Sequence, residues 1–198
     1  MRKSSRSGPA VEQDAGVAPV LPYLAIDATA AVPADVVAAV GAAGWPGRVL
    51  PQRRVWGLLV YPVVEFDQTT AAARLANGDG PEMSLWTLGL WQHWPAETTW
   101  QPPVCPVRVV GVVSDAPWRR AVDRVRQLGG LGAGLVVSRR PSQWNLLEAD
   151  ASGVWVCRVR PGGCDVVVRG RSGPVPTAVP TTHERKVNEQ FFAELIRS

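Results

Sequence analysis

Long apolar stretches alternate with amphipathic segments along the chain. Residues 54–66 and 107–113 are almost continuously apolar and rich in valine, which is typical of strands that are covered on both faces. Residues 133–137 begin a third strand of the same kind. Because Pro62 cannot donate a backbone hydrogen bond, we expect a bulge or a sheet edge near it. The pattern predicts a central sheet covered by helices.

Helical spacing is clearest between the second and third predicted strands. In residues 118–128, apolar side chains recur on one face and charged side chains occupy the other. Ser114 and Asp115 are candidate caps for this helix, and Pro117 fits its first turn. A strand, a helix and a strand in this order predict a right-handed β-α-β unit with parallel strands.

Further helices are expected at residues 33–43, 68–76 and 142–150. A Thr-x-x-Glu capping box at Thr181 and Glu184 predicts the start of an amphipathic C-terminal helix. Neither the helical nor the strand period fits residues 83–100, so no element is predicted there.

Residues 153–160 and 164–169 predict a β-hairpin across a Pro-Gly-Gly turn. One register pairs Trp155 with Val168, Cys157 with Val166, Val159 with Cys164 and Arg158 with Asp165. A tighter turn pairs Arg160 with Asp165 instead, and both registers keep the same faces. Neither register places Cys157 opposite Cys164, so no disulfide is expected between them.

The predicted fold class is therefore α/β: a mixed sheet with one right-handed β-α-β unit, a late β-hairpin and a C-terminal amphipathic helix. We expect a single domain over residues 21–198. Residues 1–20 lack periodicity and carry Arg2, Lys3 and Arg6, which predicts a disordered basic arm.

Cysteine and targeting patterns predict a cytoplasmic protein. Acidic residues and prolines interrupt any signal-peptide core near the start, and the longest apolar stretch is too broken to span a membrane. The 3 cysteines form no Cys-x-x-Cys motif, and neither histidine lies near a cysteine in sequence. We therefore expect reduced thiols, no metal site and no cofactor.

The net charge is +4, but the kind of basic residue that supplies it limits what the charge implies about function. All but Lys3 and Lys186 of the 21 basic residues are arginine, and alanine, valine, proline and glycine are abundant. This pattern is typical of GC-rich coding whatever the function. The arginine pairs, among them Arg139-Arg140, are dispersed, so either a functional basic surface or ordinary solubilising charge accounts for them.

Recognised catalytic motifs are absent from the sequence. The turn after the second strand, Ser114-Asp115-Ala116-Pro117, is no phosphate-binding loop, and Asp115 would repel a phosphate from the helix amides. There is no Gly-x-Ser-x-Gly motif for a hydrolase. A metal-dependent enzyme would draw on Asp115, Glu148, Asp150, Glu184 and Lys186. That interpretation requires three of these acids to converge in one cleft.

Two groups of residues are candidates for binding. The first group comprises Trp86, Trp91 and Trp94, together with Trp100. Packing alone, however, accounts for most tryptophans of this chain. The second group comprises Ser114, Asp115, Ser138, Arg139 and Arg140. These residues follow two parallel strands, and ligands of open α/β sheets gather beyond the carboxyl ends of such strands. The alternative is an Asp115–Arg ion pair that only ties the two loops together.

The leading functional prediction is a cytoplasmic, non-catalytic binding or interaction module whose partner is a protein or a nucleic acid. The alternative is a small metal-dependent enzyme, nuclease-like, that acts on a phosphate-bearing or nucleic-acid substrate. No membrane partner is expected.

Overall fold

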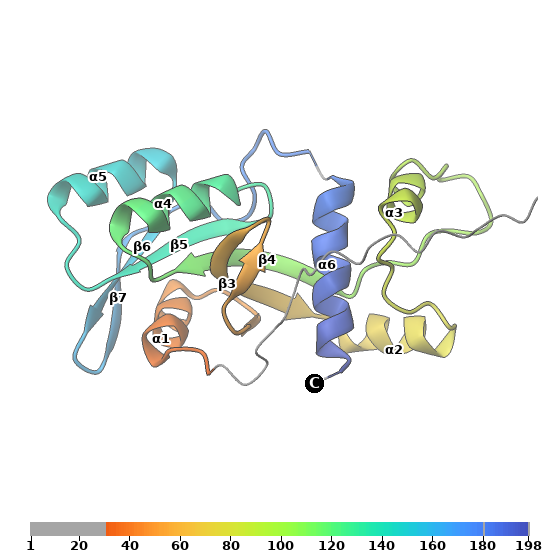
Figure 1. The fold of residues 1–198 in the computed structure, drawn as a ribbon, viewed down its shortest axis with the longest axis horizontal. Helices are drawn as coiled ribbons and strands as arrows, with labels where there is room; N and C mark the ends of the chain where they lie inside the picture. Colours follow the sequence, from red (N-terminus) through yellow and green to blue (C-terminus); the bar gives the residue numbers. More distant parts are fainter. Residues whose placement is uncertain (1–30, 180, 198) are drawn as a thin grey trace, which may run out of the picture.

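The computed structural model describes residues 31–179 and 181–197, which form helices around a mixed sheet (Figure 1). The predicted arm at residues 1–20 lies outside this part of the chain. The helices are α1 Ala34–Ala43, α2 Gln68–Ala76, α3 Leu85–Gln92, α4 Trp118–Gln127, α5 Gln143–Ser152 and α6 Thr182–Leu195. The strands are β1 Arg48–Val49, β2 Arg53–Val55, β3 Leu58–Phe66, β4 Val107–Ser114, β5 Ala133–Ser138, β6 Trp155–Arg160 and β7 Gly163–Val168.

The strand order confirms the mixed-sheet α/β class. In the described residues the order is β1-β3-β4-β5-β6-β7, with β2 paired to β3. Strands β4 and β5 are parallel, as predicted for the β-α-β unit. Strand β6 is also parallel to β5, so α5 makes a second crossover that the sequence analysis did not identify. Three consecutive parallel strands therefore end at the same edge of the sheet.

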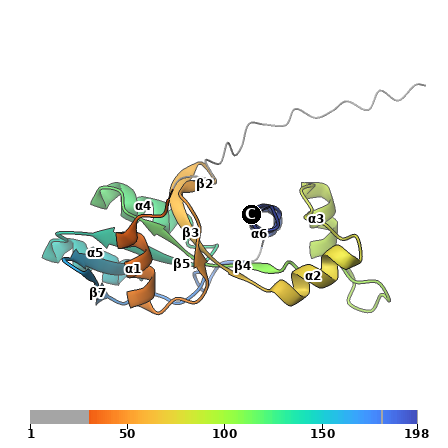
Figure 2. The same ribbon diagram turned by 90° about the horizontal axis from the view of Figure 1, so that it is seen from below.

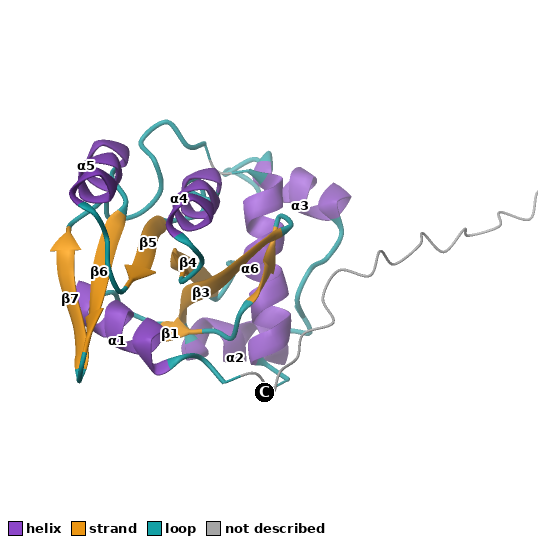
Figure 3. Cartoon of the chain, turned by 60° about the vertical axis from the view of Figure 1, so that its left-hand side comes forward, coloured by secondary structure: helices purple, strands orange, loops and turns teal. Residues whose placement is uncertain are grey.

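Helices cover the two faces of the sheet unequally. Figure 3 shows α4 and α5 above the sheet and α1 below it. One core cluster joins α4 and α6 to the sheet through Val122, Val125 and Phe192. The other packs Val36 and Val40 of α1 against the opposite face. At one end, α2 and α3 extend beyond the sheet, on the far side of α6 (Figure 2).

The predicted strand at residues 54–66 is wrong in one respect. It is a hairpin, in which Trp56 and Gly57 form the turn between β2 and β3. Their φ angles are 48° and 83°, and two successive residues in the left-handed region are the mark of a tight two-residue hairpin turn. The turn is hidden in the sequence because Trp56 continues the apolar run.

The irregularity expected near Pro62 is present. Val63 and Val64 pair with Gly111 and Val109 of β4, so the intervening Val110 is left out of the register. This bulge reverses the side-chain alternation of β4.

The predicted caps of the β-α-β helix are also wrong. The chain stays extended through Ser114, which ends β4 opposite Val136. Helix α4 then starts at Trp118 with Pro117 as its N-cap, and no side chain caps it. On α1, Val36, Ala39 and Val40 are buried, whereas Val37 is half-exposed.

The late hairpin follows the first predicted register over most of its length. Cys157, Arg158 and Val159 of β6 pair as predicted with β7. A bulge then pairs Val168 with Val156 rather than with Trp155. The cysteines of this hairpin are free, as expected. The capping box at the start of α6 is also confirmed.

The region without a predicted element contains α3, which Ser84 caps. No helix in the described residues is both long enough and apolar enough to cross a membrane.

Candidate functional site

A crevice of about 860 Å³ opens at the carboxyl ends of β4 and β5. Asp115 lines it after β4, and Ser138, Arg139 and Arg140 line it at the end of β5. Most of the other lining residues lie at or near the first turns of three helices. They are Pro33, Asp35 and Val36 at α1, Ala116, Pro117 and Trp118 at α4, and Asn145 of α5. The strands contribute Val137 and Val159. This carboxyl-edge crevice coincides with four of the five residues predicted at this edge.

Asp115 is held by a residue that the sequence analysis missed. The Tyr61 hydroxyl donates a hydrogen bond of 3.2 Å to Asp115 Oδ2. Burial, and then the charge and hydrogen bond of Asp115, raise the pKa of Tyr61 to about 12. Tyr61 therefore remains a neutral donor across the physiological pH range and orients the carboxylate.

The Asp115–Arg ion pair that was the alternative to a binding site is not formed among the described residues. Arg139 instead pairs with Asp35 of α1, with 3.2 Å between Nη2 and Oδ2. The Arg139 side chain is largely exposed and that of Asp35 is nearly half-exposed, so this pair contributes little to stability. Arg140 is exposed at the mouth of the crevice, and no described residue pairs with it.

Ser114 does not line the crevice, unlike the other residues predicted there. Its side chain is buried, 1% exposed, and its hydroxyl has no hydrogen-bond partner in the described residues.

The residues proposed for a metal-dependent enzyme lie on different elements, and two of the acids have structural roles. Glu148 accepts a hydrogen bond of 2.8 Å from the Trp118 indole. Glu184 closes the capping box of α6 by accepting from the Thr181 amide. Asp150 is exposed on α5, and Lys186 lies on α6. Among the described residues, no three histidine, cysteine or acidic side chains are grouped to hold a metal ion. The convergence that this interpretation requires is therefore not found.

The tryptophan candidates fall into exposed and packed groups. Trp86 is 76% exposed on α3, and Leu90, one turn later, is half-exposed. Trp94 packs edge-on against Trp100 at 4.8 Å between ring centroids, and both remain partly accessible. Trp91 is more enclosed, because the Arg185 guanidinium lies 5.0 Å from the centre of its ring.

Beside these tryptophans, a groove of about 480 Å³ separates residues 102–105 from α6. Trp91 and Val104 line it together with Arg185, whose guanidinium donates to the Pro103 carbonyl at 2.9 Å. The Asn188 side chain also lines the groove, and its Oδ1 is buried without a partner in the described residues.

A buried ion pair fixes this end of the molecule. Arg74 of α2 contacts Glu189 of α6 at 2.8 Å, and both side chains are almost fully buried. Arg74 also donates to the carbonyls of Asp79 and Gly80, and Glu189 accepts from the Glu82 amide at 3.1 Å. The pair therefore anchors the segment that leads into α3.

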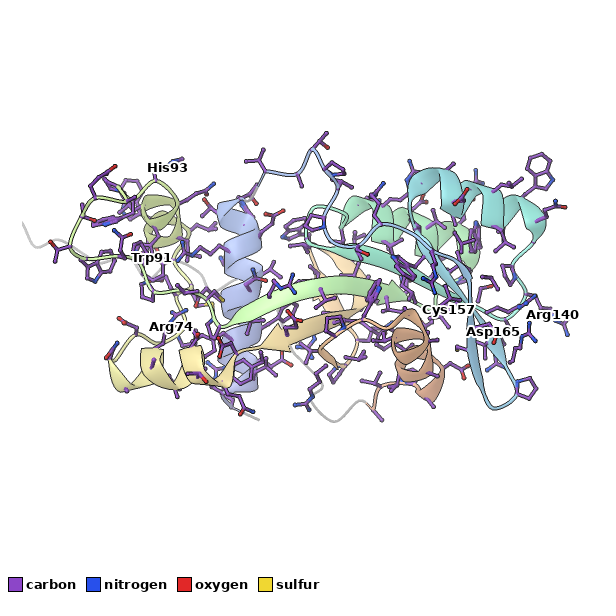
Figure 4. All side chains as sticks on the ribbon, turned by 180° about the vertical axis from the view of Figure 1, so that it is seen from behind. Arg74, Trp91, His93, Arg140, Cys157 and Asp165 are labelled. Atoms are coloured by element: carbon purple, nitrogen blue, oxygen red, sulfur yellow. The ribbon has the colours of Figure 1, made fainter. Side chains whose placement is uncertain are left out.

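The tryptophans and the arginine pair lie far apart. Figure 4 shows Trp91 and His93 at one end of the molecule and Arg140 at the other. No lysine or arginine occurs in the sequence between Arg74 and Arg108, whereas Asp79, Glu82 and Glu97 do. The segment that carries Trp86, Trp91, Trp94 and Trp100 therefore has no lysine or arginine of its own.

Comparison with known proteins found no match to this chain among protein-family models, curated proteins or solved structures.

Proposed function

We propose that this protein is a protein-interaction module and that its docking surface lies on and around α3. The surface, called here the tryptophan surface, comprises Met83, Leu85, Trp86, Leu90, Trp94, Trp100 and Val104, all of them exposed. The single observation that carries the proposal is this concentration of exposed apolar side chains in one segment of 22 residues, 83–104. Exposed apolar surface of this kind is typical of sites that other proteins cover.

The charge of the segment favours a protein over a nucleic acid. Surfaces that bind single strands place aromatic side chains within a basic groove that follows the phosphates. Here the segment between Arg74 and Arg108 carries no basic residue, and Glu82 and Glu97 would repel phosphates. Arg185, from α6, is already engaged with Trp91 and the Pro103 carbonyl.

The surface is also preformed, which lowers the entropy cost of association. The Trp94 indole donates to Thr98 Oγ1 at 2.7 Å and to the Trp100 carbonyl at 3.0 Å. Leu88 is fully buried on the opposite side of α3 and fixes the helix to the body. Rigid, amphipathic indoles are frequent anchors at the centres of interfaces.

The apolar character and the acidic residues of this segment indicate what the partner should present. We expect an apolar surface on the partner, flanked by lysine or arginine residues that complement Asp79, Glu82 and Glu97.

The test uses a photo-reactive side chain introduced at Trp86 or at Trp144, a tryptophan on α5 that is 80% exposed and serves as the matched control. Cells of the source organism are irradiated, and the cross-linked proteins are identified and purified. We expect a protein cross-linked from position 86 and not from position 144. In binding assays with that protein, Trp86→Ala should weaken binding by about tenfold or more, whereas Trp144→Ala should not.

Equal cross-linking from both positions would overturn the proposal, as would no cross-linked protein at all. Preferential cross-linking of nucleic acid from position 86 would also overturn it. Circular dichroism of each variant shows that the fold is retained.

A further inference from the structure

We propose that the carboxyl-edge crevice is a second binding site, which takes a small phosphorylated molecule that carries hydroxyl groups. Nucleoside monophosphates and sugar phosphates share this chemistry. The site is separate from the tryptophan surface and does not depend on the function proposed for it.

The place and size of the crevice support a small ligand. It lies beyond the carboxyl ends of parallel strands, where open α/β sheets commonly bind ligands. Its volume of about 860 Å³ lies within the range of about 300–1,000 Å³ that is usual for small-molecule sites.

Two adjacent guanidinium groups can hold the phosphate. Arg139 and Arg140 follow directly after β5, and both line the crevice. Arginine binds phosphate through paired, charge-assisted hydrogen bonds. Arg140 has no ion-pair partner among the described residues, and the exposed pair between Arg139 and Asp35 costs little to open.

Asp115 sets the orientation of the ligand. Its Oδ2 accepts from Tyr61, and no donor in the described part of the chain contacts its Oδ1. The carboxylate repels a phosphate from this side of the crevice and accepts hydrogen bonds from hydroxyl groups. The phosphate therefore points toward the arginines, and the hydroxyl-bearing part of the ligand points toward Asp115 and the amide of Asn145, which also lines the crevice.

The balance of charges favours one phosphate group over a polymer. Asp35 and Asp115 line the same crevice as Arg139 and Arg140, so the carboxylates offset the guanidinium charges. A nucleic acid presents successive phosphates and needs an uninterrupted row of cations. A small ligand needs only the arginine side of the crevice to be positive.

The experiment measures binding to the full chain by isothermal titration calorimetry. The probes are AMP, glucose 6-phosphate, inorganic phosphate, adenosine and a short oligothymidylate. We expect at least one of the two phosphate esters to bind, and adenosine to bind at least about tenfold more weakly than AMP. Arg139→Ala with Arg140→Ala should weaken binding of the ester by at least about tenfold.

A matched double variant removes the same charge elsewhere. Arg126 and Arg169 are exposed and do not line the crevice, so Arg126→Ala with Arg169→Ala should retain the affinity. Asp115→Asn should weaken binding of the phosphate ester relative to binding of inorganic phosphate. The substitution removes an acceptor for the hydroxyl groups of the ester, and it also removes a negative charge that repels inorganic phosphate.

Three results would overturn the proposal. One is that neither ester binds at millimolar concentration. Another is that the Arg139/Arg140 double variant binds as tightly as the wild type and only melts at a lower temperature, since the arginines would then be structural. The third is that the oligothymidylate binds more tightly than either ester.

Discussion

Arg74 and Glu189 lie 115 residues apart in sequence and meet in a buried ion pair. The Arg74 guanidinium also lies 4.9 Å from the centre of the Phe192 ring. One pair thus joins α2, the loop after it and α6, and it determines where the segment carrying the tryptophan surface is attached. The docking surface that we propose depends on this remote contact.

We expect Arg74→Ala to lower the free energy of unfolding by about 3–5 kcal/mol, because it leaves the Glu189 carboxylate buried without its counter-charge. Urea denaturation followed by circular dichroism measures this loss. The exposed pair between Arg108 and Glu65 supplies the control, and Arg108→Ala should cost at most about 1 kcal/mol. Equal losses of unfolding free energy for the two variants would show that burial does not determine how much the Arg74–Glu189 pair contributes to stability.

Gly111→Ala is expected to destabilise the protein by about 1–3 kcal/mol through overpacking. A Cβ atom at this position of β4 would come within 2.5 Å of both the Ala133 carbonyl and the Trp45 ring. Gly41, on the exposed side of α1, has no atom near its Cβ position, so Gly41→Ala should stabilise the helix by about 0.5–1 kcal/mol. Thermal and urea denaturation of the two variants should therefore give changes of opposite sign.

Thr181→Ala should cost about 1 kcal/mol of stability, because the Thr181 hydroxyl accepts from the Glu184 amide in the capping box. Thr177→Ala, at an exposed loop position, should change the stability by less than about 0.5 kcal/mol. Urea titration compares the two substitutions. A loss at Thr177 as large as that at Thr181 would contradict the capping role.

Stability should fall at alkaline pH because of the Cys157 thiol. Burial raises its pKa from 9.0 to about 12, so the folded state keeps the thiol protonated while the unfolded state ionises it. A group whose pKa is raised on folding contributes its stability in full below its unfolded pKa, and here that contribution is lost as the pH rises from about 9 to about 12.

Urea titrations at about pH 8 and about pH 10.5 test this expectation. Cys157→Ala removes the titrating group, so the variant should lose less stability than the wild type between the two values. The loss that remains in the variant contains the contributions of Cys105 and Tyr61, whose pKa values are also raised to about 12, and of Cys164, whose pKa is raised as well. Identical pH dependence in the variant and the wild type would show that Cys157 does not ionise on unfolding.

Much of the fold could be predicted because its signals are local. Valine-rich runs identified β4 and β5, and the periodicity of residues 118–128 identified α4 between them. The alternation of side chains predicted three adjacent pairs of the late hairpin, at Cys157, Arg158 and Val159. Each of these signals lies within a few residues, and it reflects a backbone geometry that those residues favour on their own.

The candidate sites were predictable to different degrees. Four residues of the carboxyl-edge crevice followed from the rule for parallel strands. Asp35 and Asn145, which line the crevice, and Tyr61, which donates to Asp115, were missed because they come from elements whose positions the sequence pattern does not specify. At the other end, the tryptophans of residues 83–100 could be named, but the pattern did not separate exposed Trp86 from enclosed Trp91.

Local sequence therefore specified most of the helices and strands, although not α3 or β1, and it specified how the late hairpin pairs up to its bulge. Tertiary structure decided the hidden turn at Trp56 and Gly57, the second crossover through α5, and the meeting of Arg74 with Glu189. The physical reason is that propensity, capping and periodicity act over one or two turns of chain. Contacts between distant residues instead depend on which apolar and charged surfaces remain to be covered once the elements pack together.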